Sequence, residues 1–260
     1  MAVTISSDTL TQLTDNLQHY NPTLNTAVEK AAGALQPLAL AFLSILFLME
    51  WLEMSKKFNV DNGGLTLEAL AELGIKYLIA VTLILGGTHI VDALVWCGIA
   101  LAKIINTWLP AQSFDGVVKP PSGHLGFMES ALLTLFQFLA QIFVWISEMI
   151  IKILVFLRSI QLYMVKVVIP IFVVFFMSEQ LKGIAIGFLK QIAAIVIQGA
   201  VLVLVVGIAP LVFSNDFANI AASGDVMTNL ANYIGIIIKM FVFAFLLVGS
   251  QNKAKQWIGA

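Results

Sequence analysis

Long apolar runs, separated by short polar segments, dominate the pattern along the chain. Four of these runs lie near the length of about 20 residues that a helix needs to cross a hydrocarbon core; they are residues 34–54, 75–102, 189–213 and 233–249. A fifth run, residues 131–177, is too long for one simple crossing and tight for two. The pattern therefore predicts an all-α, polytopic membrane protein with about five full transmembrane helices.

The run 131–177 also contains charged side chains at Glu148, Lys152, Arg158 and Lys166, and Arg158 is the only arginine of the chain. An ionisable group in hydrocarbon costs a few kcal/mol, so each needs a partner helix, a water-filled path or the membrane interface. We expect Arg158 and Lys166 to snorkel to a headgroup layer and to mark a break in the helix. The run would then make one crossing plus a re-entrant or interfacial segment.

The segment before the first span predicts an amphipathic arm. Leucines recur near helical spacing, the pattern is broken at Pro22, and the polar face carries few cationic groups. Two short helices that contact protein fit this pattern better than helices attracted to anionic lipid. The expected organisation is an extracytoplasmic arm (1–33), a transmembrane domain (34–249) and a short cytoplasmic tail (250–260).

Lysines in the polar segments predict the orientation, because cytoplasmic loops of membrane proteins are enriched in Lys and Arg. Lys56 lies in the first loop and Lys253 in the tail, whereas residues 214–232 contain no Lys or Arg. The N-terminus is therefore expected outside and the C-terminus in the cytoplasm. This requires residues 131–177 to cross an odd number of times; six simple spans are the alternative and would put the tail outside.

Composition supports the membrane class and excludes others. The chain is 60% hydrophobic and 11% charged, whereas a soluble domain is about 25% charged. A net charge of −1 argues against a nucleic-acid-binding surface, which is strongly basic. The single Cys97 cannot form an internal disulfide. The sequence contains no zinc-protease, nucleophile-elbow, CxxC or phosphate-loop motif, so we expect no enzymatic activity and no cofactor or metal site.

Polar residues within the apolar runs are the candidates for function. Glu148 and Lys152 are four residues apart, the spacing of a helical ion pair. Lys239 stands alone in the last span and needs a carboxylate or a water path; Glu148 and Asp92 are the two candidate carboxylates. His89 and Asp92 lie three apart on one helical face, as a structural polar pair or as a proton relay. The candidate intramembrane or assembly residues are Asp92, Gln141, Glu148, Lys152, Arg158, Lys166, Gln198 and Lys239.

Residues 158–213 carry a family likeness. A basic residue is followed by an apolar stretch ending in V-I-P-I, a short polar link, then G-F-L-K-Q and I-Q-G-A. This pattern resembles the TrbL-like family of conjugal transfer proteins, the polytopic inner-membrane components of type IV secretion systems. The resemblance implies a non-catalytic channel or scaffold subunit of the bacterial plasma membrane. It also implies a homo-oligomeric ring that contacts a pilus or stalk subunit outside and ATPases inside, with DNA or protein as cargo.

Two other functions are compatible with the residues. The intramembrane charges at Asp92, Glu148, Lys152 and Lys239 also suit a small-solute transporter or ion channel that works alone. Alternatively, the polar groups only specify helix packing in a structural scaffold. The two halves of the chain lack matching broken helices, which argues against the inverted repeats of secondary transporters.

Overall fold

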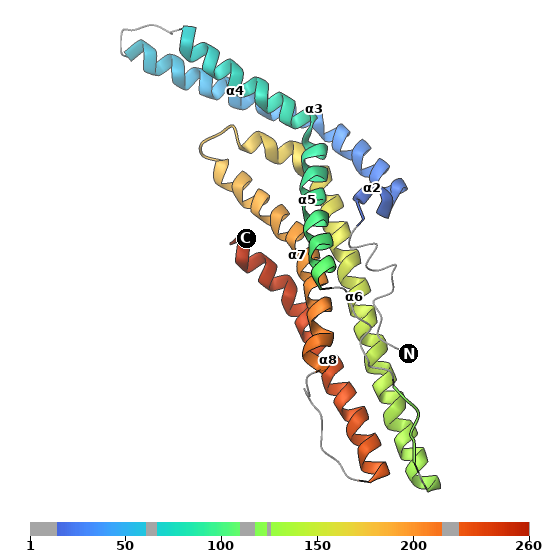
Figure 1. Ribbon diagram of the computed structural model, residues 1–260. Helices are drawn as coiled ribbons and strands as arrows, with labels where there is room; N and C mark the ends of the chain where they lie inside the picture. The colour runs from blue at the N-terminus through green and yellow to red at the C-terminus, as the bar shows by residue number, and fades with distance from the viewer. Residues whose placement is uncertain (1–14, 61–66, 110–117, 124–125, 215–223, 260) are drawn as a thin grey trace. The chain divides into compact units, whose positions relative to one another are not determined.

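The computed structural model describes residues 15–60, 67–109, 118–123, 126–214 and 224–259 (Figure 1). Within these ranges the chain forms seven helices and no strand: α2 (Leu17–Tyr20), α3 (Pro22–Val60), α4 (Leu67–Leu85), α5 (Gly87–Trp108), α6 (Phe127–Phe175), α7 (Lys182–Ser214) and α8 (Asp225–Ile258). Five of them, α3, α5, α6, α7 and α8, are long and apolar enough to cross a membrane. The predicted all-α polytopic class is confirmed. Residues 1–14 of the predicted arm lie outside the described residues.

The first long helix begins earlier than the sequence pattern predicted. The side chain of Asn16 accepts a hydrogen bond from the His19 amide at 2.8 Å and caps the short α2. The side chain of Asn21 then accepts from the Leu24 amide at 3.0 Å, the contact typical of an N-cap. From Pro22 onward α3 is one continuous helix of 39 residues. The second predicted arm helix and the first predicted span are therefore a single element.

The second predicted span, residues 75–102, is divided between α4 and α5 at Gly86. The hydrogen-bond ladder is nearly unbroken there, because the Gly86 amide still donates to the Thr82 carbonyl at 2.9 Å. A Cβ on Gly87 would lie 3.1 Å from the Ile169 side chain of α6. The glycine pair therefore lets the chain change direction while α5 begins close to α6.

α6 is one continuous helix of 49 residues. At 1.5 Å per residue it is about 74 Å long, more than twice the hydrocarbon thickness of about 30 Å. The break predicted between Arg158 and Lys166 is wrong, since both residues lie inside this helix. The part of α6 that exceeds the length of one membrane crossing therefore continues the same helix.

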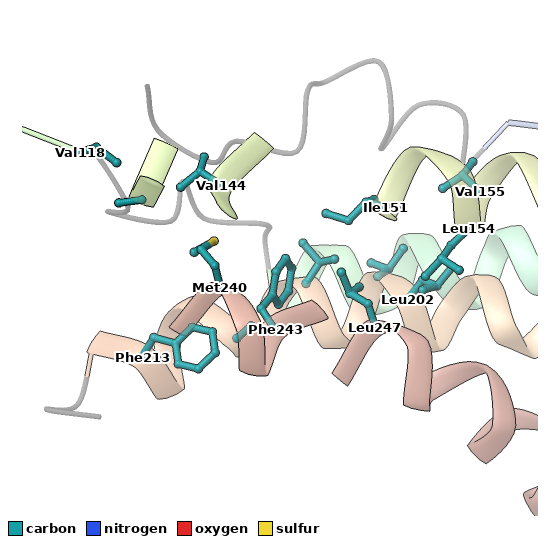
Figure 2. Packing of buried hydrophobic residues seen from close by; sticks show 14 of the residues in the cluster. Val118, Val144, Ile151, Leu154, Val155, Leu202, Phe213, Met240, Phe243 and Leu247 are labelled. Carbon is teal, nitrogen blue, oxygen red and sulfur yellow. The ribbon is translucent and has the colours of Figure 1, made fainter. Parts of the chain in front are cut away.

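The described chain divides into two compact units. Unit 1 is built mainly from residues 98–158 and 197–257, and unit 2 mainly from residues 16–97 and 159–196. The apolar core of unit 1 joins α6, α7 and α8 (Figure 2). Its fully buried members include Leu202 of α7 and Leu247 of α8. Because lipid is as apolar as these side chains, close van der Waals packing holds such helices together.

The segment 118–123 is fixed to the first turns of α8 in unit 1. The Tyr233 hydroxyl donates to the Lys119 carbonyl at 2.8 Å, and the Asn229 side-chain amide donates to the Ser122 carbonyl at 2.8 Å. This part of the predicted turn-rich loop is therefore anchored by side chains of α8.

Gly207 of α7 provides a test of the packing in unit 1. A Cβ at this position would lie 2.8 Å from the Leu109 carbonyl oxygen, and a backbone atom cannot move aside as a flexible side chain can. We expect Gly207→Ala to cost about 1–3 kcal/mol through overpacking, measured as a lower midpoint of thermal unfolding in detergent.

Gly187→Ala in the same helix is the matched control, because a Cβ there meets nothing within 4 Å. Alanine stabilises a helix relative to glycine by about 1 kcal/mol. The unfolding midpoint of Gly187→Ala is therefore expected to equal or exceed that of the unmodified chain. Equal midpoints for the two variants would show that α7 does not approach residue 109 as described.

Candidate functional site

The ammonium group of Lys166 forms the centre of a polar cluster in unit 2. Its Nζ donates to both carboxylate oxygens of Asp92 at 2.9 Å, to Oε1 of Glu29 at 3.1 Å and to Oδ1 of Asn25 at 3.0 Å. The partners come from α3 and α5, and Lys166 comes from α6. These four residues are called the Lys166 cluster below; they join three helices that are far apart in sequence.

Local structure positions the two acidic side chains of the cluster. Asn25 and Glu29 are one helical turn apart on α3, and the Asn25 side-chain amide donates to Glu29 Oε1 at 2.9 Å. Asp92 lies in the second turn of α5. The Glu29 carboxylate is therefore oriented by a neighbour on its own helix, whereas the contacts of Asp92 are to Lys166.

Burial within the Lys166 cluster is asymmetric. The Lys166 side chain is 1% exposed, whereas those of Glu29 and Asp92 are 51% and 41% exposed. An ammonium has three donors and no acceptor, and here they meet three acceptor side chains. Because a buried charge is tolerated only when it is paired and hydrogen-bonded, the cation depends on the cluster more than either carboxylate does.

The Lys166 cluster corrects two predictions from sequence. Lys166 does not snorkel to a headgroup layer. Its side chain is buried, and the carboxylates of Glu29 and Asp92 neutralise its ammonium group. Asp92 pairs with Lys166, so it serves neither Lys239 nor a hydrogen bond to His89, whose side chain is exposed.

Sequence reasoning missed Asn25 and Glu29. Both lie in the segment that was interpreted as an extracytoplasmic docking arm, so their polar atoms were expected to face another protein. Their four-residue spacing on one helical face was the available signal. It indicated that the two side chains act together, although nothing in the sequence pointed to Lys166 as their partner.

A second contact secures the beginning of the described chain beside the cluster. The Tyr163 hydroxyl, one helical turn before Lys166 on α6, donates to the Leu17 carbonyl of α2 at 2.6 Å. Both residues are buried. α2 is therefore attached to the same stretch of α6 that holds the polar cluster.

Arg158 is buried in unit 1, with 5% of its surface exposed. Its guanidinium lies against Gly199 of α7, where an added Cβ would overlap it. The snorkelling prediction is therefore wrong for Arg158 as well. Gly199 follows the buried Gln198 in the I-Q-G-A sequence, so the structure brings together two parts of the segment that carries the family likeness.

The remaining candidate residues lie in unit 1, and the ion pair predicted between Glu148 and Lys152 is not formed. No ion pair joins Glu148 to Lys152; Glu148 is half-buried and Lys152 is exposed. A pair at this spacing is worth only about 0.2–0.5 kcal/mol, too little to order two long side chains. Half-buried Lys239 and Gln141 likewise form no hydrogen bond or ion pair with any residue that the structure describes.

α6 and α8 come into contact near two of these charges. The Ser147 hydroxyl lies 3.4 Å from the Met240 carbonyl oxygen, which it approaches as a donor. Glu148 and Lys239 are the sequence neighbours of these two residues. Opposite charges therefore occur at the same level of two helices in unit 1, each left unmatched within the described chain.

A further polar contact links α3 to α4. Glu50 accepts hydrogen bonds from the Lys76 ammonium and, at 2.9 Å, from the Tyr77 hydroxyl. It also lines a cavity of about 250 Å³ together with Glu53 and Glu179. Among the residues that the structure describes, no group of three or more His, Cys, Asp or Glu side chains is placed to hold a metal ion.

No protein-family model, curated protein or solved structure matches this chain at a significant level. The likeness of residues 158–213 to the TrbL-like family therefore stays a prediction. In the described sites polar side chains join helices, and Glu148, Lys152 and Lys239 form no ion pair with any described residue.

The asymmetric burial of the Lys166 cluster makes a prediction about stability. Asp92→Asn leaves a buried ammonium short of one carboxylate and is expected to cost about 1–3 kcal/mol. Lys166→Met removes the buried cation and leaves carboxylates that are half exposed, so its loss should be smaller. Thermal unfolding in detergent compares the two variants.

The double variant Asp92→Asn/Lys166→Met is expected to be more stable than Asp92→Asn alone, because it no longer contains a buried cation that lacks one of its two carboxylates. Lys152→Met is the matched control for loss of a lysine, since that side chain is exposed and forms no ion pair within the described part of the chain. A double variant that is the least stable of the set would contradict the burial argument.

Proposed function

We propose that this chain is a non-catalytic channel or scaffold subunit of a type IV secretion machine, assembled as a homo-oligomeric ring in a bacterial inner membrane. The observation that carries the proposal is a set of three charges in unit 1, Glu148, Lys152 and Lys239, that form no ion pair with any residue the structure describes. They lie in helices long and apolar enough to cross a membrane. Such charges require water or a partner, and an assembled complex supplies both.

The resemblance of residues 158–213 supports the type of machine. The chain has no nucleotide-binding motif, so the energy for transport would come from ATPases on the cytoplasmic side. A pilus or stalk subunit would contact the outer side, and DNA or protein would be the cargo. The close approach of Arg158 to Gly199 supports a structural role for two parts of that sequence pattern: the basic residue packs against the glycine of I-Q-G-A, where a larger residue would overlap it.

The signs of the unmatched charges support a ring. Glu148 on α6 and Lys239 on α8 are opposite in charge, so α6 of one copy can pair with α8 of the next. An interface between two different surfaces of the same chain is heterologous and generates a ring when its rotation closes. The same contact would neutralise both groups within the membrane.

Deletion of the gene in its native host tests the proposed machine. We expect conjugative transfer or protein secretion to be abolished while the secretion ATPases stay at normal levels, and a plasmid copy to restore transfer. Normal transfer in the deletion strain would refute the proposal. Ion or solute flux through the purified protein alone in liposomes, lost in Glu148→Gln, would instead favour a stand-alone channel.

Charge exchange tests the proposed ring contact. Lys239→Glu and Glu148→Lys each place like charges at the interface and should weaken self-association roughly tenfold or more, since about 1.4 kcal/mol changes an association constant tenfold. The double exchange should restore it. Self-association is measured by mass photometry in detergent and by transfer frequency in cells.

Lys190→Glu is the control for a charge reversal outside unit 1, because that lysine is exposed and belongs to unit 2. It should leave the oligomer intact. If the double exchange assembles no better than either single variant, Glu148 and Lys239 do not pair between copies.

A further inference from the structure

A groove in unit 1 runs between α7 and α8, with a cavity volume of about 580 Å³. Its lining is almost entirely apolar, and its polar members gather toward the end of α8; it is formed by Val201, Leu204, Val205, Phe241, Val242, Phe245, Leu246, Gly249, Ser250, Lys253 and Trp257. The volume lies in the range of small-molecule sites. We propose that this groove binds an anionic phospholipid, with an acyl chain along the apolar lining and the phosphate at Lys253.

The dimensions of the groove fit one leaflet of a bilayer. α8 is long and apolar enough to cross the membrane. Between Phe241 and Lys253 it rises about 18 Å at 1.5 Å per residue. One leaflet contributes about 15 Å of hydrocarbon, half of the core thickness. An acyl chain that starts at the level of Lys253 would therefore reach the neighbourhood of Phe241.

The large side chains of the lining suit hydrocarbon as the occupant. Phe241 and Phe245 are 55% and 66% exposed, and their rings contact each other with centroids 5.0 Å apart. Other parts of the described chain leave these rings exposed, and α8 is long enough to cross a membrane. Lipid tails would therefore contact them in the bilayer. The groove gives one tail a fixed path.

Charge at one end of the groove selects the headgroup. Lys253 is exposed, and its ammonium donates to the Gln256 side chain at 3.2 Å, leaving further donors for a phosphate. Trp257 is 67% exposed, and tryptophan prefers the headgroup level of a membrane. In the predicted orientation this end faces the cytoplasm, where anionic lipids attract cationic segments. If a helix from a second copy filled the groove instead, it would have to place an acidic side chain beside Lys253.

Gly249 allows the groove to be blocked without disturbing the fold. It lines the groove, and a Cβ built on it meets nothing within 4 Å. A larger side chain at this position therefore enters the space proposed for the acyl chain. Gly249 also lies inside α8, where replacement of glycine does not weaken a helix.

The test measures phospholipid bound to the purified full-length chain by native mass spectrometry, after exchange into detergent with equal amounts of phosphatidylglycerol and phosphatidylcholine. The unmodified chain is expected to retain phosphatidylglycerol preferentially. Gly249→Phe should lose the retained lipid, and Lys253→Gln should lose the preference for phosphatidylglycerol. Gly187→Phe, at another open glycine, and Lys255→Gln, outside the groove lining, should behave as the unmodified chain.

Two results would overturn the proposal. The first is equal lipid retention in the unmodified chain and Gly249→Phe, with no change of headgroup preference in Lys253→Gln. The second is a disulfide between copies through Gly249→Cys in native membranes, which would identify a second copy as the occupant. Because the readout is binding by the purified chain, the outcome does not depend on the proposed role in secretion.

Discussion

A buried ammonium that must be neutralised by other helices is the constraint on which unit 2 depends. Apolar contact alone gives helices little preference for one another in lipid, so directional polar contacts determine their register. Lys166 binds carboxylates of both α3 and α5, and a slide of either helix by one turn would separate the charges. One side chain of α6 thus fixes the relative heights of three helices.

Unit 1 solves the packing problem differently. Its helices meet through an apolar core (Figure 2) and through glycines where bulky groups approach, such as Gly199 beside Arg158 and Gly207 beside Leu109. Glu148 and Lys152 on α6 and Lys239 on α8 form no ion pair with any residue that the structure describes. Unit 2 therefore contains a buried charge that is neutralised by other helices of the same unit, whereas three charges of unit 1 have no ion-pair partner among the described residues.

The sequence predicted what depends on local pattern and missed what depends on distant partners. Long apolar runs identified the helical membrane class, because their length alone meets a physical requirement. A charge in such a run was assigned to the membrane interface, yet the partners of Lys166 lie 74 and 137 residues away. The local pair of Glu148 and Lys152 was predicted from spacing, although its small energy does not determine a structure.

The uneven exposure of the Lys166 cluster has a consequence for its role. Replacing a buried ion pair by packed apolar groups is often neutral or stabilising, so stability alone does not require a lysine here. The half-exposed carboxylates of Glu29 and Asp92 are accessible to other molecules, whereas the buried ammonium of Lys166 is not. A partner that competes for Glu29 would weaken the link between α3 and α6. Tyr163 attaches α2 one turn before Lys166 on α6, so α2 and α3 are held to neighbouring turns of the same helix by separate contacts.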